Sequence, residues 1–243
     1  MPETASSAAH PIGLFDSGVG GLSIWEKITE ALPLESTLYL ADLARCPYGP
    51  RPREEIIARC DHIVRFLLEQ NCKLVVVACN TATGFAIDTL RQRFPIPFVG
   101  IEPGIKPAAL HSHTGHIGVL ATTGTFQGRL FQETKTRFAN HVEVLMAEGT
   151  GLVELVERGE TDSPAAEKLL RQYLEPMLAA RIDHLVLGCT HYPFLEKPIR
   201  RIIGPRITLV TTGSAVARRT RFLLEQHNLL NASSPAAHRF LAT

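Results

Sequence analysis

The sequence predicts an α/β fold of two similar parallel-sheet units, related by a pseudo-twofold axis, with the active site in the cleft between them. Two observations predict this fold class. Short apolar runs typical of buried strands alternate with segments of helical period along the 243 residues. The same apolar runs also recur at nearly one offset in the two halves of the chain.

Eight apolar runs have the length and the turn-forming boundaries of buried strands. In chain order they cover residues 12–16, 38–42, 74–79, 98–102, 117–122, 142–147, 184–189 and 207–211. Helical period is clearest after Pro52, where one face carries Ile56, Ile57, Cys60, Ile63, Val64, Leu67 and Leu68. Cys60 lies on that face, so we expect it to belong to the core.

The eight strands form two sets of four. Those that begin at positions 12, 38, 74 and 98 match those that begin at 117, 142, 184 and 207, at offsets of 105, 104, 110 and 109 residues. We therefore expect a first unit of residues 12–100 plus 207–231 and a second unit of residues 101–206. Residues 1–11 are predicted to be a disordered N-terminal tail, and residues 232–243 a flexible C-terminal tail.

The charge balance and the cysteine content exclude several classes of protein. The chain has 25 basic and 24 acidic residues and a net charge of +1, which gives no basic footprint for a nucleic acid. No apolar run approaches membrane-spanning length, so we expect no membrane partner. Five cysteines, an odd number without paired spacing, argue against a secreted disulfide framework and favour a reducing, cytoplasmic setting.

Polar residues and cysteines gather at the carboxyl ends of the predicted strands, where open α/β sheets bind their ligands. Cys79 and Cys189 hold equivalent places in the two halves, each at the end of an apolar strand and at the start of a helix. We expect the helix N-terminus to lower the pKa of each thiol, because its free N–H groups and positive dipole end favour the thiolate. Asp16 and His191 could tune the protonation of the two thiols.

Two such groups that face each other suit the racemisation of an α-carbon. A single-step reaction needs one deprotonated group to take a proton from one face and one protonated group to return a proton to the other. Other strand-end groups would hold an amino acid between the sulfurs; they are Ser17, Asn80, Thr81, Thr190 and the backbone of Tyr48 and Gly49. No lysine lies in a strand-end motif, so we expect no pyridoxal cofactor. We also expect no metal, because the candidate ligands lack the spacing of a zinc-binding motif.

Five ordered motifs of the chain resemble those of the aspartate/glutamate racemase superfamily and, within it, closely those of the glutamate racemases. The resemblance runs from about residue 12 to about residue 230. Its motifs are Phe15-Asp16-Ser17-Gly18-Val19-Gly20-Gly21, Asp42 with Pro47-Tyr48-Gly49, Ala78-Cys79-Asn80-Thr81-Ala82, Ala121-Thr122 with Gly124-Thr125, and Gly188-Cys189-Thr190-His191-Tyr192-Pro193.

The resemblance implies an enzyme that interconverts L- and D-glutamate without a cofactor and so supplies D-glutamate for peptidoglycan of the cell wall. It implies that Cys79 and Cys189 are the proton donors and acceptors, that Asp16 and His191 take part in catalysis, and that Glu157 assists His191. The substrate-binding residues that it implies are Asp16, Ser17, Tyr48, Gly49, Asn80, Thr81, Thr122, Thr190 and His191. We also expect a homodimer.

Other interpretations of these residues stay open. The glycines of segment 18–21 are similar to a dinucleotide-binding turn, although Ser23 replaces the third glycine of that motif and Asp16 would face the pyrophosphate. Asp16 could also merely cap the turn after its strand. Cys46 and Cys72 lack the strand-end context, so we expect them to be structural.

A zinc site and a pure binding function are the remaining alternatives. Cys79, Cys189 and His191 are ligand types that zinc prefers, but their spacing matches no zinc-binding motif. A chain that kept the amino-acid cleft without turnover would bind glutamate and leave it unchanged.

Overall fold

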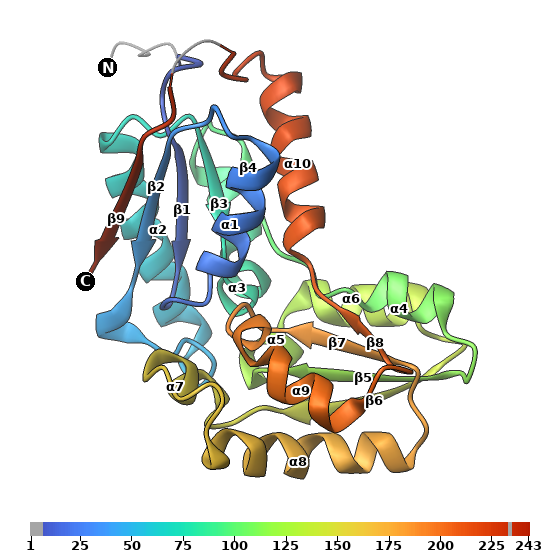
Figure 1. Ribbon diagram of the computed structural model, residues 1–243. Coiled ribbons are helices and arrows are strands. Elements are labelled where there is room, and N and C mark those ends of the chain that lie inside the picture. The colour runs from blue at the N-terminus through green and yellow to red at the C-terminus, as the bar shows by residue number, and fades with distance from the viewer. Residues whose placement is uncertain (1–6, 233–234) are drawn as a thin grey trace.

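The computed structural model describes residues 7–232 and 235–243, and Figure 1 shows two parallel sheets, one with its strands running down the view and one with its strands across it. The first sheet has the order β4-β3-β1-β2-β9 and the second the order β6-β5-β7-β8. The first comprises β1 (Ile12–Asp16), β2 (Thr37–Ala41), β3 (Leu74–Val77), β4 (Phe98–Val99) and β9 (His238–Ala242). The second comprises β5 (His116–Ala121), β6 (Glu143–Glu148), β7 (His184–Gly188) and β8 (Thr208–Val210).

All eight predicted strands are confirmed, and most begin and end within one or two residues of the prediction. β4 is the exception, because it ends at Val99 and not at residue 102. The backbone N–H of Ile101 donates a hydrogen bond to the side-chain oxygen of Thr83 (3.1 Å), and so it does not extend the pairing with β3.

The two sheets share one strand order. When β1 to β4 are matched with β5 to β8, as the sequence offsets predict, the same neighbours occur in both sheets. This agreement supports a duplicated α/β unit. The twofold axis that would relate the two units stays a prediction.

Helices cover both faces of each sheet, which is why the central strands are continuous apolar runs. In the first unit, α2 (Arg53–Glu69) and α3 (Asn80–Arg93) pack on one face, and α1 (Leu22–Ala31) and α10 (Gly213–Gln226) on the other. The predicted apolar face of α2 is confirmed. It buries Ile56, Cys60, Ile63, Val64 and Leu67, and it partly buries Ile57 and Leu68.

The second sheet is covered in the same way (Figure 1). On one face lie α7 (Leu152–Glu157), α8 (Pro164–Ala179) and α9 (Glu196–Ile203). On the other lie α4 (Ile105–His111), α5 (Thr123–Gln127) and α6 (Arg129–Phe138). Two short 3₁₀ helices, η1 (Leu43–Arg45) and η2 (Tyr192–Leu195), follow strand ends.

Two predicted boundaries are wrong. Residues 207–210 were assigned to the first unit, but β8 pairs with β7 in the second sheet, and only the following α10 returns to the first unit. Residues 238–242 of the predicted flexible tail form β9, which pairs in parallel with β2. Phe240 of β9 packs against the ring of Trp25 (5.0 Å between centroids), so aromatic contacts from the first unit hold this edge strand.

The predicted disorder of residues 1–11 is wrong for the part that the structure describes. Residues 1–6 lie outside the described residues. Further on, the backbone N–H of Lys73 donates to the carbonyl of Pro11 (3.0 Å), and its ammonium group donates to the carbonyl of Ala8.

No described helix combines the length and the apolar character needed to cross a bilayer.

Candidate active site

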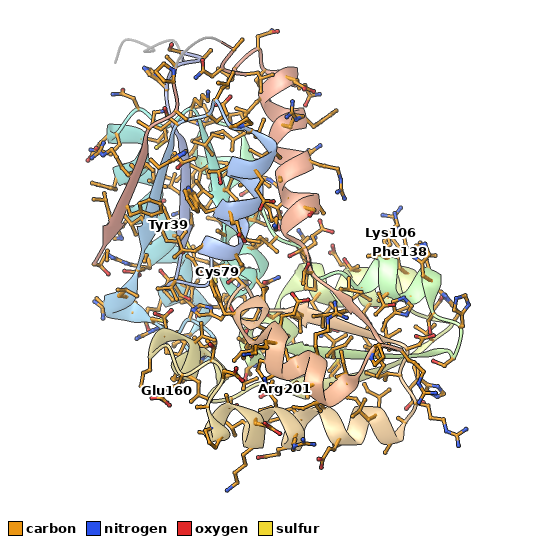
Figure 2. The ribbon with its side chains drawn as sticks, viewed as in Figure 1. Tyr39, Cys79, Lys106, Phe138, Glu160 and Arg201 are labelled. Atoms are coloured by element: carbon orange, nitrogen blue, oxygen red, sulfur yellow. The ribbon has the colours of Figure 1, made fainter. Side chains whose placement is uncertain are left out.

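Cys79 and Cys189 line one small cavity between the two units. Cys79 follows β3 and is the N-cap of α3, and Cys189 follows β7, the equivalent strand of the second sheet. The arrowheads of β3 and β7 point toward the junction of the units, where Figure 2 labels Cys79. Both side chains are buried.

The cavity brings together almost all the residues that the sequence predicted for the site. Its walls are Ser17, Pro47, Tyr48, Gly49, Cys79, Asn80, Thr81, Thr122, Thr125, Val153, Cys189, Thr190 and His191. Asp16 and Glu157, the two other predicted residues, are hydrogen-bonded to wall residues. The cavity volume is only about 10 Å³, room for about one water molecule, so the described conformation is closed.

Cys79 is a thiol whose surroundings disfavour the thiolate. Burial and then the neighbouring Asp16 carboxylate raise the pKa of Cys79 well above its ordinary value. A hydrogen bond from the Ala82 N–H in the first turn of α3 (3.5 Å to the sulfur) opposes this rise only in part. The predicted lowering of the Cys79 pKa is therefore wrong for this closed conformation, because burial outweighs the helix N-terminus.

Asp16 is a fully buried carboxyl group that connects the two units. Its Oδ2 atom accepts hydrogen bonds from the Gly21 N–H (2.7 Å) and, from the second unit, the Thr190 hydroxyl (3.4 Å). Burial raises the pKa of Asp16, and the nearby charge of His191 opposes that rise. The same carboxyl therefore affects both halves of the site.

His191 links Cys189 to Glu157. Its Nδ1 atom lies 3.8 Å from the Cys189 sulfur, and its Nε2 atom lies 2.6 Å from Glu157 Oε1. Burial alone would lower the pKa of His191, but hydrogen bonds to Cys189, Cys46 and Glu157 raise it well above its ordinary value, and so does the charge of Asp16. This environment favours an imidazolium 3.8 Å from the Cys189 sulfur.

Glu157 is held as a carboxylate. Burial raises its pKa, but hydrogen bonds from His191 and from the Val19 N–H (2.8 Å) outweigh burial, and the pKa lies below its ordinary value. Glu157 contacts Nε2 of His191, whereas Cys189 lies near Nδ1 of the same ring. These are the contacts that a carboxylate assisting His191 would make.

The glycines after β1 make room for side chains of the second unit. A Cβ on Gly20 would lie 2.2 Å from His191 Nδ1, and one on Gly18 would lie 1.8 Å from Glu157 Oε1. The backbone N–H groups on either side of Gly20 already donate to the carboxylates of Glu157 and Asp16. The dinucleotide alternative is therefore wrong, because the space and the donors that a pyrophosphate needs are both taken.

Donors suited to a carboxylate lie in the cavity wall. The Nδ2 atom of Asn80 is buried and has no hydrogen-bond partner among the described residues. An unpaired buried donor costs about 1–3 kcal/mol, so Asn80 is a strong candidate to bind a ligand. The hydroxyl oxygens of Thr81, Thr122 and Thr125 form a chain with separations of 2.9 Å, and Thr125 donates to the carbonyl of Gly188.

The side chain of Tyr48 anchors the loop that carries Gly49. Its hydroxyl donates to Asp42 Oδ2 (2.6 Å), and Arg59 makes two further hydrogen bonds to the same carboxylate (2.7 and 2.6 Å). Burial raises the pKa of Asp42, but the hydrogen bonds from Arg59, Tyr48 and Thr243 outweigh burial and lower it. The Tyr48 hydroxyl is thus engaged by Asp42, while Tyr48 and Gly49 line the cavity.

Four contributors to the site were missed in the sequence. Pro47, Thr125 and Val153 line the cavity. Cys46, which we expected to be structural, has its sulfur 3.7 Å from Glu157 Oε1 and hydrogen-bonds to His191. Its position just before the Pro47-Tyr48-Gly49 motif was the signal that could have identified it.

The zinc alternative named the wrong ligand set. Within the described part of the chain, the metal-ligating atoms that come within 4.8 Å of one another belong to Cys46, Glu157 and His191. Cys79 and Cys189 do not join His191 in such a set.

A larger cleft lies beside the cavity and shares only Cys189 and Thr190 with its walls. Its volume is about 580 Å³, and its walls come from α1, the start of α10, Phe240 of β9 and the segment from Cys189 to Glu196. Cys79 is not among its described wall residues. A ligand in this cleft would therefore reach Cys189 alone, and the cavity between the two cysteines remains the candidate active site.

The chain is similar to known racemases over most of its length. The Asp/Glu/hydantoin racemase family matches residues 12–220. A glutamate racemase of Pseudomonas syringae pv. tomato is 51% identical over 227 residues, which are 93% of this chain and 82% of that protein. The crystal structure of a glutamate racemase isoform from Bacillus anthracis is 35% identical with a TM-score of 0.87, and the match covers 96% of this chain and 88% of that one. The glutamate racemase of Francisella tularensis, solved with D-glutamate, is 30% identical with a TM-score of 0.84 and coverages of 97% and 89%.

Proposed function

The chain belongs to the Asp/Glu/hydantoin racemase family and, within it, to the glutamate racemases, and from this premise we propose that it interconverts L- and D-glutamate with two cysteines as acid and base. One observation supports the proposal most strongly. Cys79 and Cys189 follow equivalent strands of two sheets and line the same cavity, one from each unit. A substrate held between them would present opposite faces of its α-carbon to the two sulfurs.

In the proposed reaction, the thiolate of one cysteine takes the α-proton, and the electron pair of the broken C–H bond stays on the substrate as a carbanion stabilised by its carboxylate. The thiol of the other cysteine then donates its proton to the opposite face. Each turnover leaves the two protonation states exchanged. Proton exchange with Asp16, His191 and water resets them.

The surroundings of the two sulfurs suit different starting states. Cys79 is the neutral thiol in the closed conformation, because burial and the Asp16 carboxylate disfavour its thiolate. Cys189 lies 3.8 Å from the ring of His191, whose contacts favour the imidazolium form. We therefore propose that Asp16 exchanges protons with Cys79 and that His191 exchanges protons with Cys189. Glu157 is proposed to position His191.

The substrate is proposed to bind through groups of the cavity wall. Asn80 supplies the unpaired amide donor, and the hydroxyls of Thr81 and Thr122 lie beside it. Further contacts are expected from Asp16, Ser17, Tyr48, Gly49, Thr190 and His191. Because the closed cavity holds about one water, binding requires the two units to separate and then close over the substrate.

Two thiols with their own carboxyl and imidazole partners supply both proton positions, so the reaction is proposed to need neither pyridoxal phosphate nor a metal. The described walls of the cavity contain no lysine that could form a Schiff base. In the cell, the product D-glutamate is proposed to serve peptidoglycan synthesis in the cytoplasm. The homodimer also stays a prediction, which the molar mass in solution tests.

The experiment is to follow L-glutamate by circular dichroism with dialysed protein and no added cofactor. We expect racemisation to the 1:1 mixture, and deuterium at Cα of the product in deuterated water, because a cysteine proton exchanges with solvent between turnovers. Cys79→Ala and Cys189→Ala should each lose several orders of magnitude of activity in both directions. Binding of glutamate without turnover would support the binding-module alternative, and substantial activity in either variant would overturn the two-cysteine assignment.

A further inference from the structure

We infer that Cys46, Glu157 and His191 form a binding site for a zinc-class divalent cation, and that a cation bound there stops racemisation. The inhibition rests on the proposed function of the neighbouring cavity, whereas the cation binding itself does not. The site is distinct from the two proton-transferring cysteines, because neither Cys79 nor Cys189 belongs to its ligand set.

The three ligand atoms converge from separate parts of the chain. Cys46 follows η1 in the first unit, Glu157 ends α7, and His191 precedes η2. The sulfur of Cys46 is 3.7 Å from Glu157 Oε1, and His191 Nε2 is 2.6 Å from the same oxygen. All three ligand atoms lie within 4.8 Å of one another.

These separations are close to those of a tetrahedral zinc site. Zinc binds thiolate, imidazole and carboxylate atoms at roughly 2.0–2.3 Å, which places neighbouring ligand atoms about 3.3–3.6 Å apart. The sulfur-to-oxygen separation of 3.7 Å therefore needs almost no change. The His191–Glu157 pair must open by about 0.7 Å from 2.6 Å. It would do so as the cation replaces the proton that the two atoms share.

The ligand types select the class of cation. A cysteine sulfur with one imidazole and one carboxylate suits Zn²⁺, whereas Mg²⁺ and Ca²⁺ prefer oxygen ligands alone. Three protein ligands leave a fourth position for water, as in open zinc sites. Glu157 and Cys46 are partly exposed, so a cation has a path to the site from solvent.

The loop after β1 holds this arrangement in place. Gly18 has no Cβ, and a Cβ there would lie 1.8 Å from Glu157 Oε1 and 3.0 Å from the Cys46 sulfur. The Val19 N–H donates to the same Oε1 atom of Glu157 (2.8 Å), which helps to fix the carboxylate. The ligand atoms are therefore preorganised, and little reordering is needed for a cation to bind.

Occupation of the site would remove the partner of Cys189. With a metal on Nε2, the His191 ring holds at most one proton, on Nδ1, and its bond to Glu157 is lost. The ring could no longer act as the imidazolium that lies 3.8 Å from the Cys189 sulfur. Racemisation should then fall as the site fills, without the cation touching the substrate.

The binding experiment uses Co²⁺ with reduced, metal-free protein, because a cysteine ligand to cobalt gives a thiolate-to-metal charge-transfer absorption. We expect this absorption in the wild type, in Cys79→Ala and in Cys189→Ala. It should disappear in Cys46→Ala and stay in the matched control Cys72→Ala, which removes a buried thiol of the first unit. Cys46→Ser is the second variant if Cys46→Ala does not fold.

The inhibition experiment titrates Zn²⁺ alone against racemase activity. We expect inhibition that a chelator reverses, and a Zn²⁺ concentration for half-inhibition at least about tenfold higher in Cys46→Ala than in the wild type, since even outer partners of a metal site change affinity by this much. Three outcomes would overturn the inference. They are loss of the cobalt absorption in Cys79→Ala or Cys189→Ala, its persistence in Cys46→Ala, and its absence in the wild type. If the metal-free wild type has no racemase activity, the proposed function is refuted. The cobalt absorption would still test cation binding at Cys46, Glu157 and His191.

Discussion

Replacing Glu157 by glutamine tests how much racemisation depends on the charge behind His191. Glu157 Oε1 lies 2.6 Å from His191 Nε2 and accepts the Val19 N–H at 2.8 Å. Glutamine keeps the shape and one acceptor oxygen but removes the charge. Hydrogen bonds to charged groups contribute about 1.5–3 kcal/mol and neutral ones about 0.5–1.5 kcal/mol, so the change removes about 1–2 kcal/mol. If the imidazolium forms in the transition state, kcat/KM falls about 5–30-fold.

The alanine variant extends the series. Glu157→Ala removes both contacts, about 1.5–3 kcal/mol, and should lower kcat/KM about 10–150-fold. Because the two enantiomers have equal free energies, kcat/KM must fall by the same factor whether the assay starts from L- or D-glutamate. Circular dichroism measures both directions.

The matched control is Glu160→Gln, three residues further along the chain (Figure 2). Glu160 pairs with Arg158 at 2.8 Å, but both side chains are exposed, and such surface pairs contribute about 0–1 kcal/mol. The control should therefore keep wild-type kcat/KM. Wild-type kcat/KM in Glu157→Gln, or an equal loss in the control, would refute the reasoning.

Three further predictions concern Gly20, the ion pair of Arg59 with Asp42, and the choice of substrate. Gly20→Ala would place a Cβ 2.2 Å from His191 Nδ1, so the ring must move by about 1 Å and kcat/KM should fall about 100-fold. Steady-state kinetics measures this loss, and an unchanged thermal midpoint would show that the variant is still folded. Wild-type kinetics would contradict the prediction. Arg59→Ala leaves the buried Asp42 carboxylate without its cation and should cost about 3 kcal/mol of unfolding free energy at pH 7. Because the folded pKa of Asp42 is lowered, this contribution is present above the unfolded pKa of about 3.9 and is lost as the pH falls through the folded pKa; urea unfolding should show the variant and wild type converging at low pH, and a constant gap would count against the ion pair. Glutamate should be racemised at least about tenfold more efficiently than aspartate, since one methylene is worth roughly 1–3 kcal/mol; equal turnover of aspartate by the same preparation would remove the glutamate assignment while leaving the two-cysteine chemistry intact.

The local pattern of the sequence determined most of the fold. Apolar runs with turn-forming boundaries are sufficient to identify a buried parallel strand, because such a strand is covered on both faces. The eight strands, the buried face of α2 and the equivalent places of Cys79 and Cys189 all follow from such short-range patterns. β9 was missed because it is an edge strand with mostly exposed residues, held by contacts with Trp25 far away in the chain.

The tertiary structure alone decided the electrostatics of the site. The sequence shows a cysteine at a helix N-terminus, but the pKa of Cys79 depends on its burial and on Asp16, which the fold brings beside it. Cys46 and Glu157 are 111 residues apart, and Glu157 and His191 are 34 apart, so no spacing rule would have grouped them. Strand pattern is local and can be read along the chain, whereas desolvation and charge interactions depend on distances that exist only after the two units have packed together.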